Sequence, residues 1–471
     1  MQDGVGQEGW RSLLRREWLP TLAVLLGGVL LQSMSVLMLT TVLPSIVGEL
    51  GGVAMLSWPT TAFLASSIVA ASCAGMLASA VGARVAYCAG VALFGLGALL
   101  CSLAPTMGWI VAGRLIQGFG GGLEAAAAYV AVRATFPEAV WSRTIALMST
   151  SWSMSVLIGP LVGGMFARFG SWRSAFVATA VTAGVLAVGA FFILPPATSM
   201  RRTPAPGVPA DRVALICLAI AATSSASIVI SPLLKAALIC GALMALVVML
   251  RLDRVAPNPL LPSDAFSLRT PTGVGLWAAL LLCITYSPLQ IYVPIFLQQL
   301  HGFDPLAAGF TVASASLGWT AGSLVTAGAS EAQRDRLILS GPVVMAVSLM
   351  AIAWLTPGPH TLLLIPAIVL LGIGIGQCWP FVAERVMAGA SAGEEAIAAS
   401  SVPTVQQTGF ALGAALAGLV ANASGLEAGI ADAGMLRAAF WVPASFVVAA
   451  VLAILAGLRL RRLRQVNAHS S

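Results

Sequence analysis

The chain has 471 residues, of which 59% are hydrophobic and only 9% are charged, whereas a soluble protein carries about 25% charged residues. So few charges cannot cover a water-facing surface, but they suit a surface that faces lipid. The net charge of +7 comes from basic residues scattered between apolar runs, so we expect no nucleic-acid partner. The seven cysteines stand singly in apolar segments, and we expect neither disulfides nor a metal site.

Apolar runs recur along the whole chain, each about as long as a helix that crosses a bilayer. Strands of a membrane barrel would alternate apolar and polar residues instead. The sequence therefore predicts an all-α polytopic membrane protein with about fourteen transmembrane helices. In chain order, the expected spans are 18–45, 54–80, 84–104, 107–132, 142–168, 172–195, 211–231, 232–252, 271–298, 305–329, 335–356, 361–388, 398–421 and 434–459.

The basic residues between the spans distinguish the two sides of the membrane. With both termini in the cytoplasm, nearly all of them fall inside, and the exceptions are Arg168, Arg173, Lys235 and Arg437. This asymmetry follows the positive-inside rule. Leaving out the middle pair of spans would not disturb it, so twelve spans remain the alternative.

Two proline-containing linkers, Pro196–Ala210 and Asp253–Arg269, flank the middle pair of spans. They divide the spans into six, two and six. We therefore expect a cytoplasmic tail, a six-helix bundle, a linker with two extra helices, a second six-helix bundle and a second cytoplasmic tail, at 1–17, 18–195, 196–270, 271–459 and 460–471.

The fourth span carries the most unusual residues for a membrane helix. Arg114 lies inside the span, where a charge is costly and usually functional; the alternative is an arginine that bonds neighbouring carbonyls and fixes packing. Gly113, Gln117, Gly120 and Glu124 fall on one stripe of this helix. Glu124 is about 15 Å from Arg114 along the helix, so we expect no direct ion pair.

Glu124 is the candidate proton carrier. Burial favours the neutral form of a carboxyl group, and a coupling group must take up and release a proton under working conditions. The alternative interpretation is a hydrogen-bonded glutamate with a structural role.

The fifth span contains Gly159-Pro160-Leu-Val-Gly163-Gly164. Small residues permit close helix approach, and Pro160 removes a backbone hydrogen bond and bends the helix. Such a helix suits a moving interface, although it suits a static bend equally well.

Two short loops at related positions, Gly75 to Arg84 with Gly82 between them and Gly322 to Arg336, suggest that the halves repeat. Other polar and aromatic residues within spans are candidates for a substrate cavity, although each also suits an interhelical hydrogen bond or an interfacial anchor. These candidates are Gln32, Gln117, Tyr129, Tyr286, Gln290, Gln377, Trp379 and Gln406.

Together these segments resemble the major facilitator superfamily, and in particular its fourteen-span drug:proton antiporter branch. Arg114–Gly122 looks like the family's fourth-span motif, and Gly159–Gly164 is similar to the antiporter motif of the fifth span. Trp172-Arg173 stands where the family has a W-R pair, and Gly75–Arg84 looks like a degraded form of its Gly-x-Leu-Ala-Asp-Arg loop.

The resemblance implies two six-helix bundles around a central cavity, with two inserted helices, in a multi-pass protein of the bacterial inner membrane. It implies a monomer that exports a small organic substrate across the lipid bilayer by alternating access, in exchange for protons. Arg114 would help proton coupling, and the Gly159–Gly164 helix would seal the bundle interface.

Two departures from the family pattern affect this expectation. Ser79 replaces the acid of the loop motif, and Ser35 stands where the branch commonly has an acid in the first span. Glu124 is then the clearest acid near mid-membrane, and our hypothesis is that it alone carries the coupling proton.

Other functions remain as alternatives. One is an exporter or importer dedicated to a single metabolite, and another is a transporter-like sensor that does not transport. A membrane enzyme is disfavoured, because HExxH and GxSxG motifs are missing and the histidines fall in expected loops or the tail: His301, His360 and His469. We expect no cofactor.

Overall fold

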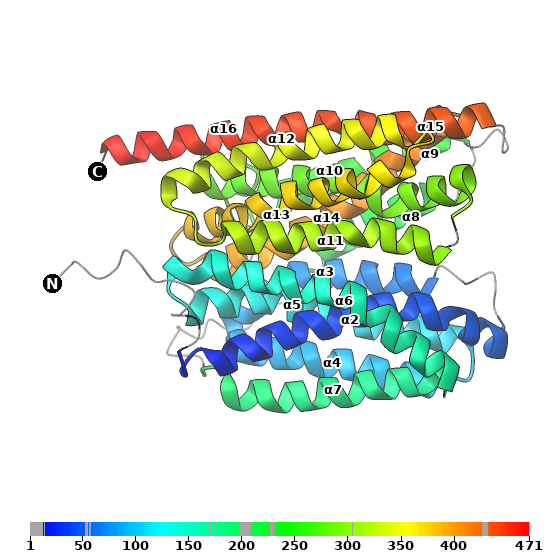
Figure 1. The fold of residues 1–471 in the computed structure, drawn as a ribbon. Helices are drawn as coiled ribbons and strands as arrows, with labels where there is room; N and C mark the ends of the chain where they lie inside the picture. Colours follow the sequence, from blue (N-terminus) through cyan, green and yellow to red (C-terminus); the bar gives the residue numbers. More distant parts are fainter. Residues whose placement is uncertain are drawn as a thin grey trace. The chain divides into compact units, whose positions relative to one another are not determined.

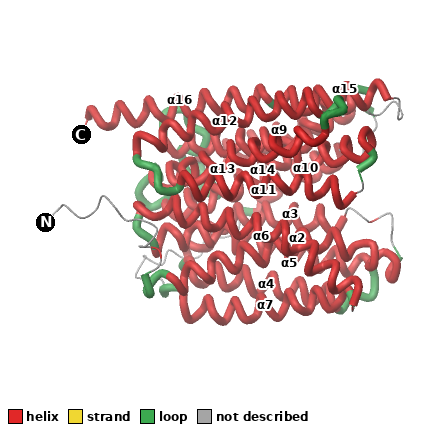
Figure 2. The backbone as a smooth tube through the Cα atoms, viewed as in Figure 1, coloured by secondary structure: helices red, strands yellow, loops and turns green. Residues whose placement is uncertain are grey.

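The computed structural model describes residues 13, 15–51, 55, 58–169, 171–196, 209–226, 229, 231–257, 259–303, 305–425 and 432–470, with the backbone alone at some helical positions. Throughout this part of the chain the regular structure is helical (Figure 2). The chain divides into two compact units, which comprise 1–213, 255–263 and 391–404 in the first and 214–254, 264–390 and 405–471 in the second.

The first unit is built around one helix, α5. Its helices are α2 (Leu19–Leu50), α3 (Trp58–Val81), α4 (Ala83–Ser102), α5 (Met107–Thr135), α6 (Trp141–Phe169) and α7 (Trp172–Ile193). α5 packs against α3 and α4, while α2 packs against α6 and α7 (Figure 1). Most residues of α5 are buried, and Arg114, Gln117 and Glu124 are among them, so these polar side chains face protein rather than lipid.

The second unit repeats several of these pairings. Its helices are α8 (Ala210–Ala226), α9 (Pro232–Arg254), α10 (Pro271–His301), α11 (Pro305–Thr326), α12 (Glu331–Leu355), α13 (Leu364–Ala388), α14 (Glu395–Ala423), α15 (Asp432–Ser445) and α16 (Val447–Ser470). The first turns of α14 belong to the first unit. α13 packs against α11 and α12, as α5 packs against α3 and α4. Likewise, α16 packs against α10 and α12, as α7 packs against α2 and α4.

Glycines set the register of this repeat. On α5, Gly120 lies against the backbone of α4, and a Cβ there would come within 2.6 Å of the Gly90 carbonyl oxygen. On α13, Gly374 makes the same approach to α12, where a Cβ would lie 3.0 Å from the Gly341 carbonyl oxygen. Gly120 and Gly374 therefore occupy equivalent positions, and this register places Cys378 at the position of Glu124.

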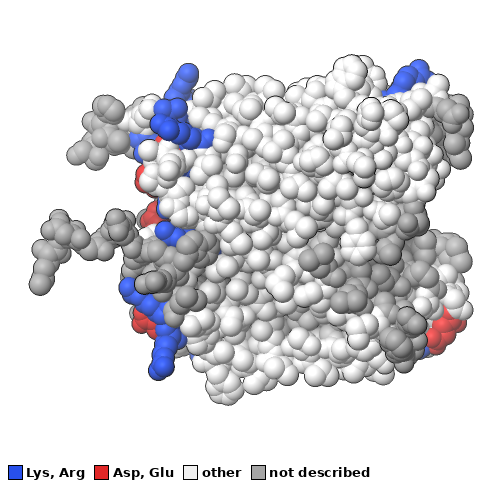
Figure 3. Space-filling view, viewed as in Figure 1, with Lys and Arg blue, Asp and Glu red and all other residues white. Residues whose placement is uncertain are grey.

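The membrane-crossing helices follow the apolar runs. Eleven helices in the described part of the chain are long and apolar enough to cross a bilayer, so the protein is a multi-pass membrane protein. α6, α8 and α11 lie at three of the fourteen expected spans but are not among these eleven. On the face shown in Figure 3, charged side chains lie toward the helix ends, and the described surface between them shows none.

The last expected span, 434–459, agrees with one candidate membrane span, Ala433–Gln465, which a turn at Phe446 divides into α15 and α16. Pro443 lies inside the last turn of α15 and has no N–H to continue the helical ladder. The chain continues through a turn, in which the Phe446 N–H donates to the Pro443 carbonyl at 3.2 Å. An apolar run by itself does not reveal such a break.

Candidate functional site

The polar residues expected on the fourth span lie on α5 and are buried. Arg114 and Gln117 are fully buried, and Glu124 is 3% exposed. α5 owes its position to its glycines, which bring α4 to one side and α3 to the other at backbone distance. Tyr129, farther along the same helix, is also buried.

Arg114 is held by uncharged partners. Its Nη1 donates to Gln117 Oε1 at 2.7 Å and to Ser35 Oγ at 3.3 Å. Its Nε donates to the Pro59 carbonyl oxygen at 3.5 Å, and its guanidinium carbon lies 4.2 Å from the centre of the Phe63 ring. A buried charge needs such compensation. Here α2, α3 and Gln117 of α5 itself supply part of it without a carboxylate among these contacts, and Nη2 has no hydrogen-bond partner among the described residues.

Ser35 is the common acceptor of this cluster, because Gln117 Nε2 also donates to its hydroxyl at 3.0 Å. The residue that replaces the expected first-span acid therefore contacts the arginine directly. The cluster joins α2, α3 and α5, and it agrees with the packing role that the sequence left open for Arg114.

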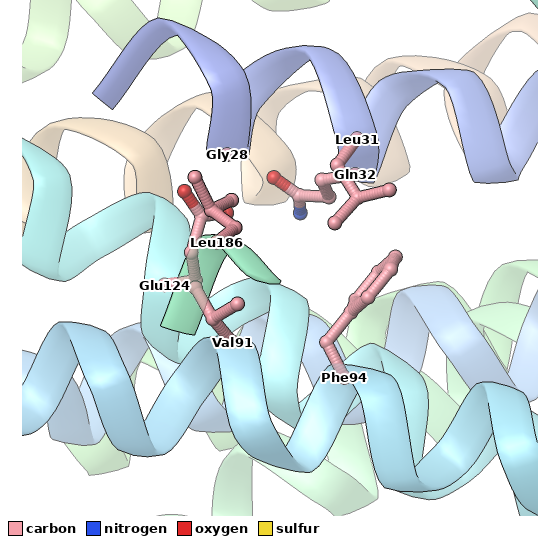
Figure 4. Close-up of a pocket in the computed structure, with 7 residues that line it drawn as sticks. All are labelled: Gly28, Leu31, Gln32, Val91, Phe94, Glu124 and Leu186. Carbon is pink, nitrogen blue, oxygen red and sulfur yellow. The ribbon is translucent and has the colours of Figure 1, made fainter. Parts of the chain in front are cut away.

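Glu124 lies some distance along α5 from this cluster, at a small cavity. The cavity has room for about one water molecule. It is lined by Gly28, Leu31, Gln32, Val91, Phe94, Glu124 and Leu186. Figure 4 shows the Glu124 carboxyl beside Gly28 of α2, with Gln32 on the same helix. Glu124 Oε1 has no hydrogen-bond partner among the described residues.

A tyrosine that the sequence analysis did not single out stands next to this carboxyl group. Tyr87 of α4 is fully buried, and its hydroxyl and the Glu124 carboxyl both lie against Gly28 of α2. A Cβ at Gly28 would overlap both groups, so glycine leaves the space that they occupy. The hydroxyl donates to the Val24 carbonyl oxygen of α2 at 2.8 Å.

The fifth-span motif brings α6 against α2. A Cβ at Gly159 would lie 2.8 Å from the Leu37 Cβ, and Ser155 Oγ is 2.5 Å from Ser33 Oγ. Gly163 is buried. The side chain of Pro160 and the surroundings of Gly164 are outside what the structure describes.

The expected gating loop makes close backbone contacts within the first unit. A Cβ at Gly75 would lie 2.8 Å from the Ile397 Cα of α14. Gly82 has a φ of 90° at the start of α4, a conformation that favours glycine. Arg84 lies over the Phe191 ring and donates to the Leu194 carbonyl oxygen at 3.5 Å, so it links α4 to the end of α7.

Two of the cavity candidates in the second unit share an aromatic cluster. The Trp319 ring lies 5.4 Å from that of Tyr286 and 6.0 Å from that of Trp379, between ring centres. Gln377 instead donates to Ser340 Oγ on α12 at 3.1 Å. Two further candidates lie apart from the cluster, with Gln290 exposed and Gln406 half-buried.

Trp172 and Arg173 bind the start of α7 to the end of α2. Trp172 Nε1 donates to Glu49 Oε2 of α2 at 2.7 Å, Arg173 pairs with the same carboxylate, and Arg173 Nη2 donates to the Ala104 carbonyl oxygen at 3.0 Å. The hydrogen bonds from Arg173 and Trp172 lower the pKa of the Glu49 carboxyl below its ordinary value.

The second unit has an ionic cluster that the sequence analysis did not predict. Arg334 pairs with the buried Glu384 of α13, and Arg385 lies 2.8 Å from Glu331. Asp335 is 2.9 Å from Arg464 of α16. The alternation of acids and bases at the start of α12 was the available signal.

Known proteins are similar to this chain in sequence and in fold. A sequence model of the Major Facilitator Superfamily matches residues 25–414. A protein of Mycobacterium tuberculosis (strain ATCC 25618 / H37Rv), named as a probable multidrug-efflux transporter, is 34% identical over 465 residues, which is 95% of each chain. MdtD of Salmonella paratyphi A (strain ATCC 9150 / SARB42), whose name classes it as a multidrug resistance protein, is 28% identical over 294 residues, or 62% of each chain.

The crystal structure of the human organic anion transporter MFSD10 (TETRAN) is similar, with a TM-score of 0.71 over 94% of this chain and 99% of that one. Its sequence identity of 14% limits the likeness to the fold. The match of the family model and the relative that is alike from end to end lead to one conclusion: the chain belongs to the Major Facilitator Superfamily, and it is a membrane transporter rather than an enzyme.

Proposed function

We propose that this transporter exports drug-like organic compounds in exchange for protons, and that Glu124 carries the proton. One observation supports the proton site above all: a buried carboxyl group borders a water-sized cavity, with no hydrogen-bond donor to its Oε1 among the described residues. An ionised carboxylate is costly in such a place, whereas the neutral acid is not. The names of the relatives support the class of substrate.

The repeat supports a coupling role that is confined to the first unit. In the register set by Gly120 and Gly374, Ile368 is the repeat equivalent of Arg114 and Cys378 is the repeat equivalent of Glu124. The second unit therefore has no basic or carboxylic side chain at these two positions. It offers the aromatic cluster of Tyr286, Trp319 and Trp379 instead, which suits contact with an apolar substrate.

In the proposed cycle, Glu124 holds its proton while the cavity is closed. When the helices that border the cavity separate on one side, water solvates the carboxylate and the proton leaves to that water. Arg114 remains fixed by its uncharged partners and contributes a positive charge to the same helix. Substrate movement in the opposite direction accompanies the return to the protonated state.

The topology that we propose has fourteen spans, in which α6, α8 and α11 also cross the bilayer. The six-helix bundles comprise 18–195 and 271–459, and the linker 196–270 carries the two inserted helices. Both termini face the cytoplasm of a bacterial inner membrane, and the transporter works as a monomer.

Transport into everted membrane vesicles under an imposed pH gradient tests this function. We expect at least one compound in a panel of fluorescent lipophilic dyes to accumulate with wild type, and accumulation to be lost in Glu124→Gln. Full proton-driven transport by Glu124→Gln would contradict the assignment. A dedicated metabolite exporter would show no dye transport and no change in drug susceptibility, while untargeted analysis would find one metabolite released.

A further inference from the structure

We propose that Tyr87 is a positioning residue that couples the proton on Glu124 to the position of α2. This inference rests on the proposed role of Glu124 and adds a second residue to it. The Tyr87 hydroxyl lies between the carboxyl group on α5 and the backbone of α2, so a change at one can be transmitted to the other.

The Tyr87 hydroxyl has a single hydrogen. A phenol hydroxyl has one hydrogen to donate, together with lone pairs that accept. In the structure Tyr87 donates its hydrogen to the Val24 carbonyl oxygen at 2.8 Å. Toward Glu124 it can therefore only accept. A carboxylic acid can donate to this oxygen, whereas a carboxylate cannot, so the arrangement in the structure suits the protonated acid.

The remaining surroundings of Glu124 supply no competing charge. Arg84 and Cys88 are the other titratable side chains near Tyr87 on α4. The Arg84 guanidinium lies over the Phe191 ring of α7, and the Cys88 thiol donates to the Ala187 carbonyl oxygen of α7 at 3.7 Å. α2 and α7 border the cavity with the uncharged side chains of Leu31, Gln32 and Leu186. On α5, Arg114 lies ten residues before Glu124 and is bonded to Ser35 and Gln117.

Loss of its proton turns the Glu124 carboxyl group from a hydrogen-bond donor into an acceptor. When the proton leaves Glu124 to water in the cavity, the carboxylate needs a donor, and the nearest hydroxyl is that of Tyr87. Rotation about the phenol C–O bond then moves the hydrogen from the Val24 carbonyl oxygen to the carboxylate. Tyr87 keeps its hydrogen throughout, and the net change is one proton released and one α2–α4 hydrogen bond lost.

The lost bond loosens the helix that holds the rest of the polar site. α2 also carries Ser33, which faces Ser155 of α6, and Ser35, which accepts from Arg114. Proton release at Glu124 would thus free one end of a helix that touches both the antiporter-motif helix and the buried arginine.

Infrared difference spectroscopy of the purified protein tests the inference without a known substrate. The carbonyl stretch of protonated Glu124 is followed against pH and is assigned by its loss in Glu124→Gln. In Tyr87→Phe the acid loses a neutral partner, but the carboxylate loses a charge-assisted bond that is about twice as strong. We expect the midpoint to rise by about one pH unit.

Two further variants make the test decisive. Fluorotyrosine at position 87 keeps the fold and is a stronger donor, so the midpoint should fall. Tyr292→Phe removes a hydroxyl from α10 in the second unit and should leave the midpoint unchanged. Unchanged midpoints in both Tyr87 variants would overturn this inference alone. If Glu124→Gln removed no titrating band, the proposed proton carrier itself would be refuted.

Discussion

Gly90 of α4 is the position where one added side chain should disturb Glu124 most directly. A Cβ at Gly90 would lie 2.6 Å from the Glu124 nitrogen, and 2.9 Å from both the Glu124 Cα and the Gly120 carbonyl oxygen. These are backbone atoms, which cannot turn aside as the end of a side chain can. Because ordinary contact begins at 3.4 Å, Gly90→Val must force α4 away from α5.

Overpacking of this kind costs about 1–3 kcal/mol, and valine recovers only a few tenths of a kcal/mol in helix propensity over glycine. We expect a net loss of about 2 kcal/mol, seen as an unfolding midpoint several degrees below that of wild type in a thermal melt of the purified protein. Proton-driven transport should fall as well, since Tyr87 moves away from Glu124 with α4.

The matched control is Gly184→Val on α7, where an added Cβ meets nothing within 4 Å. Its melting midpoint and transport should equal those of wild type or exceed them slightly. If Gly90→Val and Gly184→Val melted at the same temperature and transported equally well, the close approach of α4 and α5 would not be what positions Glu124.

Three other substitutions test separate contacts. Ser35→Ala removes the acceptor shared by two buried donors of α5 and should cost about 1–3 kcal/mol in thermal stability, whereas Ser35→Asp, which keeps an acceptor, should not. The pKa of Glu49 is lowered in the folded state from its ordinary value of 4.5. The ionised carboxylate should therefore stabilise the fold above pH 4.5, and this stabilisation should be lost as the pH falls below that value. The melting midpoints of wild type and Glu49→Gln should converge on acidification. Glu384→Gln leaves Arg334 without its buried partner and should cost about 3 kcal/mol, measured by thermal unfolding, and a midpoint within a degree of wild type would contradict this.

The sequence could predict the helices because each apolar run is itself the cause of a membrane helix. The expected span 107–132 corresponds to α5 at Met107–Thr135. The expected middle pair corresponds to α8 and α9, whose apolar run has a proline at the start of α9. The break between α15 and α16 was missed, because Pro443 can bend a helix or end it and only the surrounding packing decides.

The partners of the polar residues were harder to predict. The periodicity of a helix places Gly120 and Glu124 on one stripe, but it does not say which neighbouring helix faces that stripe. That depends on contacts such as Gly90 against Gly120, which join residues far apart in the sequence. Tyr87 was missed for this reason, since nothing in its own segment points to Glu124. Ser35 was noticed only as the place of a missing acid, and its two donors became evident from the structure.

Reaction of Glu124 with dicyclohexylcarbodiimide tests the central claim most directly, because this apolar reagent modifies protonated carboxyl groups. The protein would be treated across a range of pH, and the modified fraction at residue 124 measured by peptide mass spectrometry. We predict strong modification at low pH that declines as the pH rises, with transport lost in proportion to the modified fraction. A Glu124 that stays unreactive at every pH, or reacts equally at all of them, would contradict its role as the proton carrier.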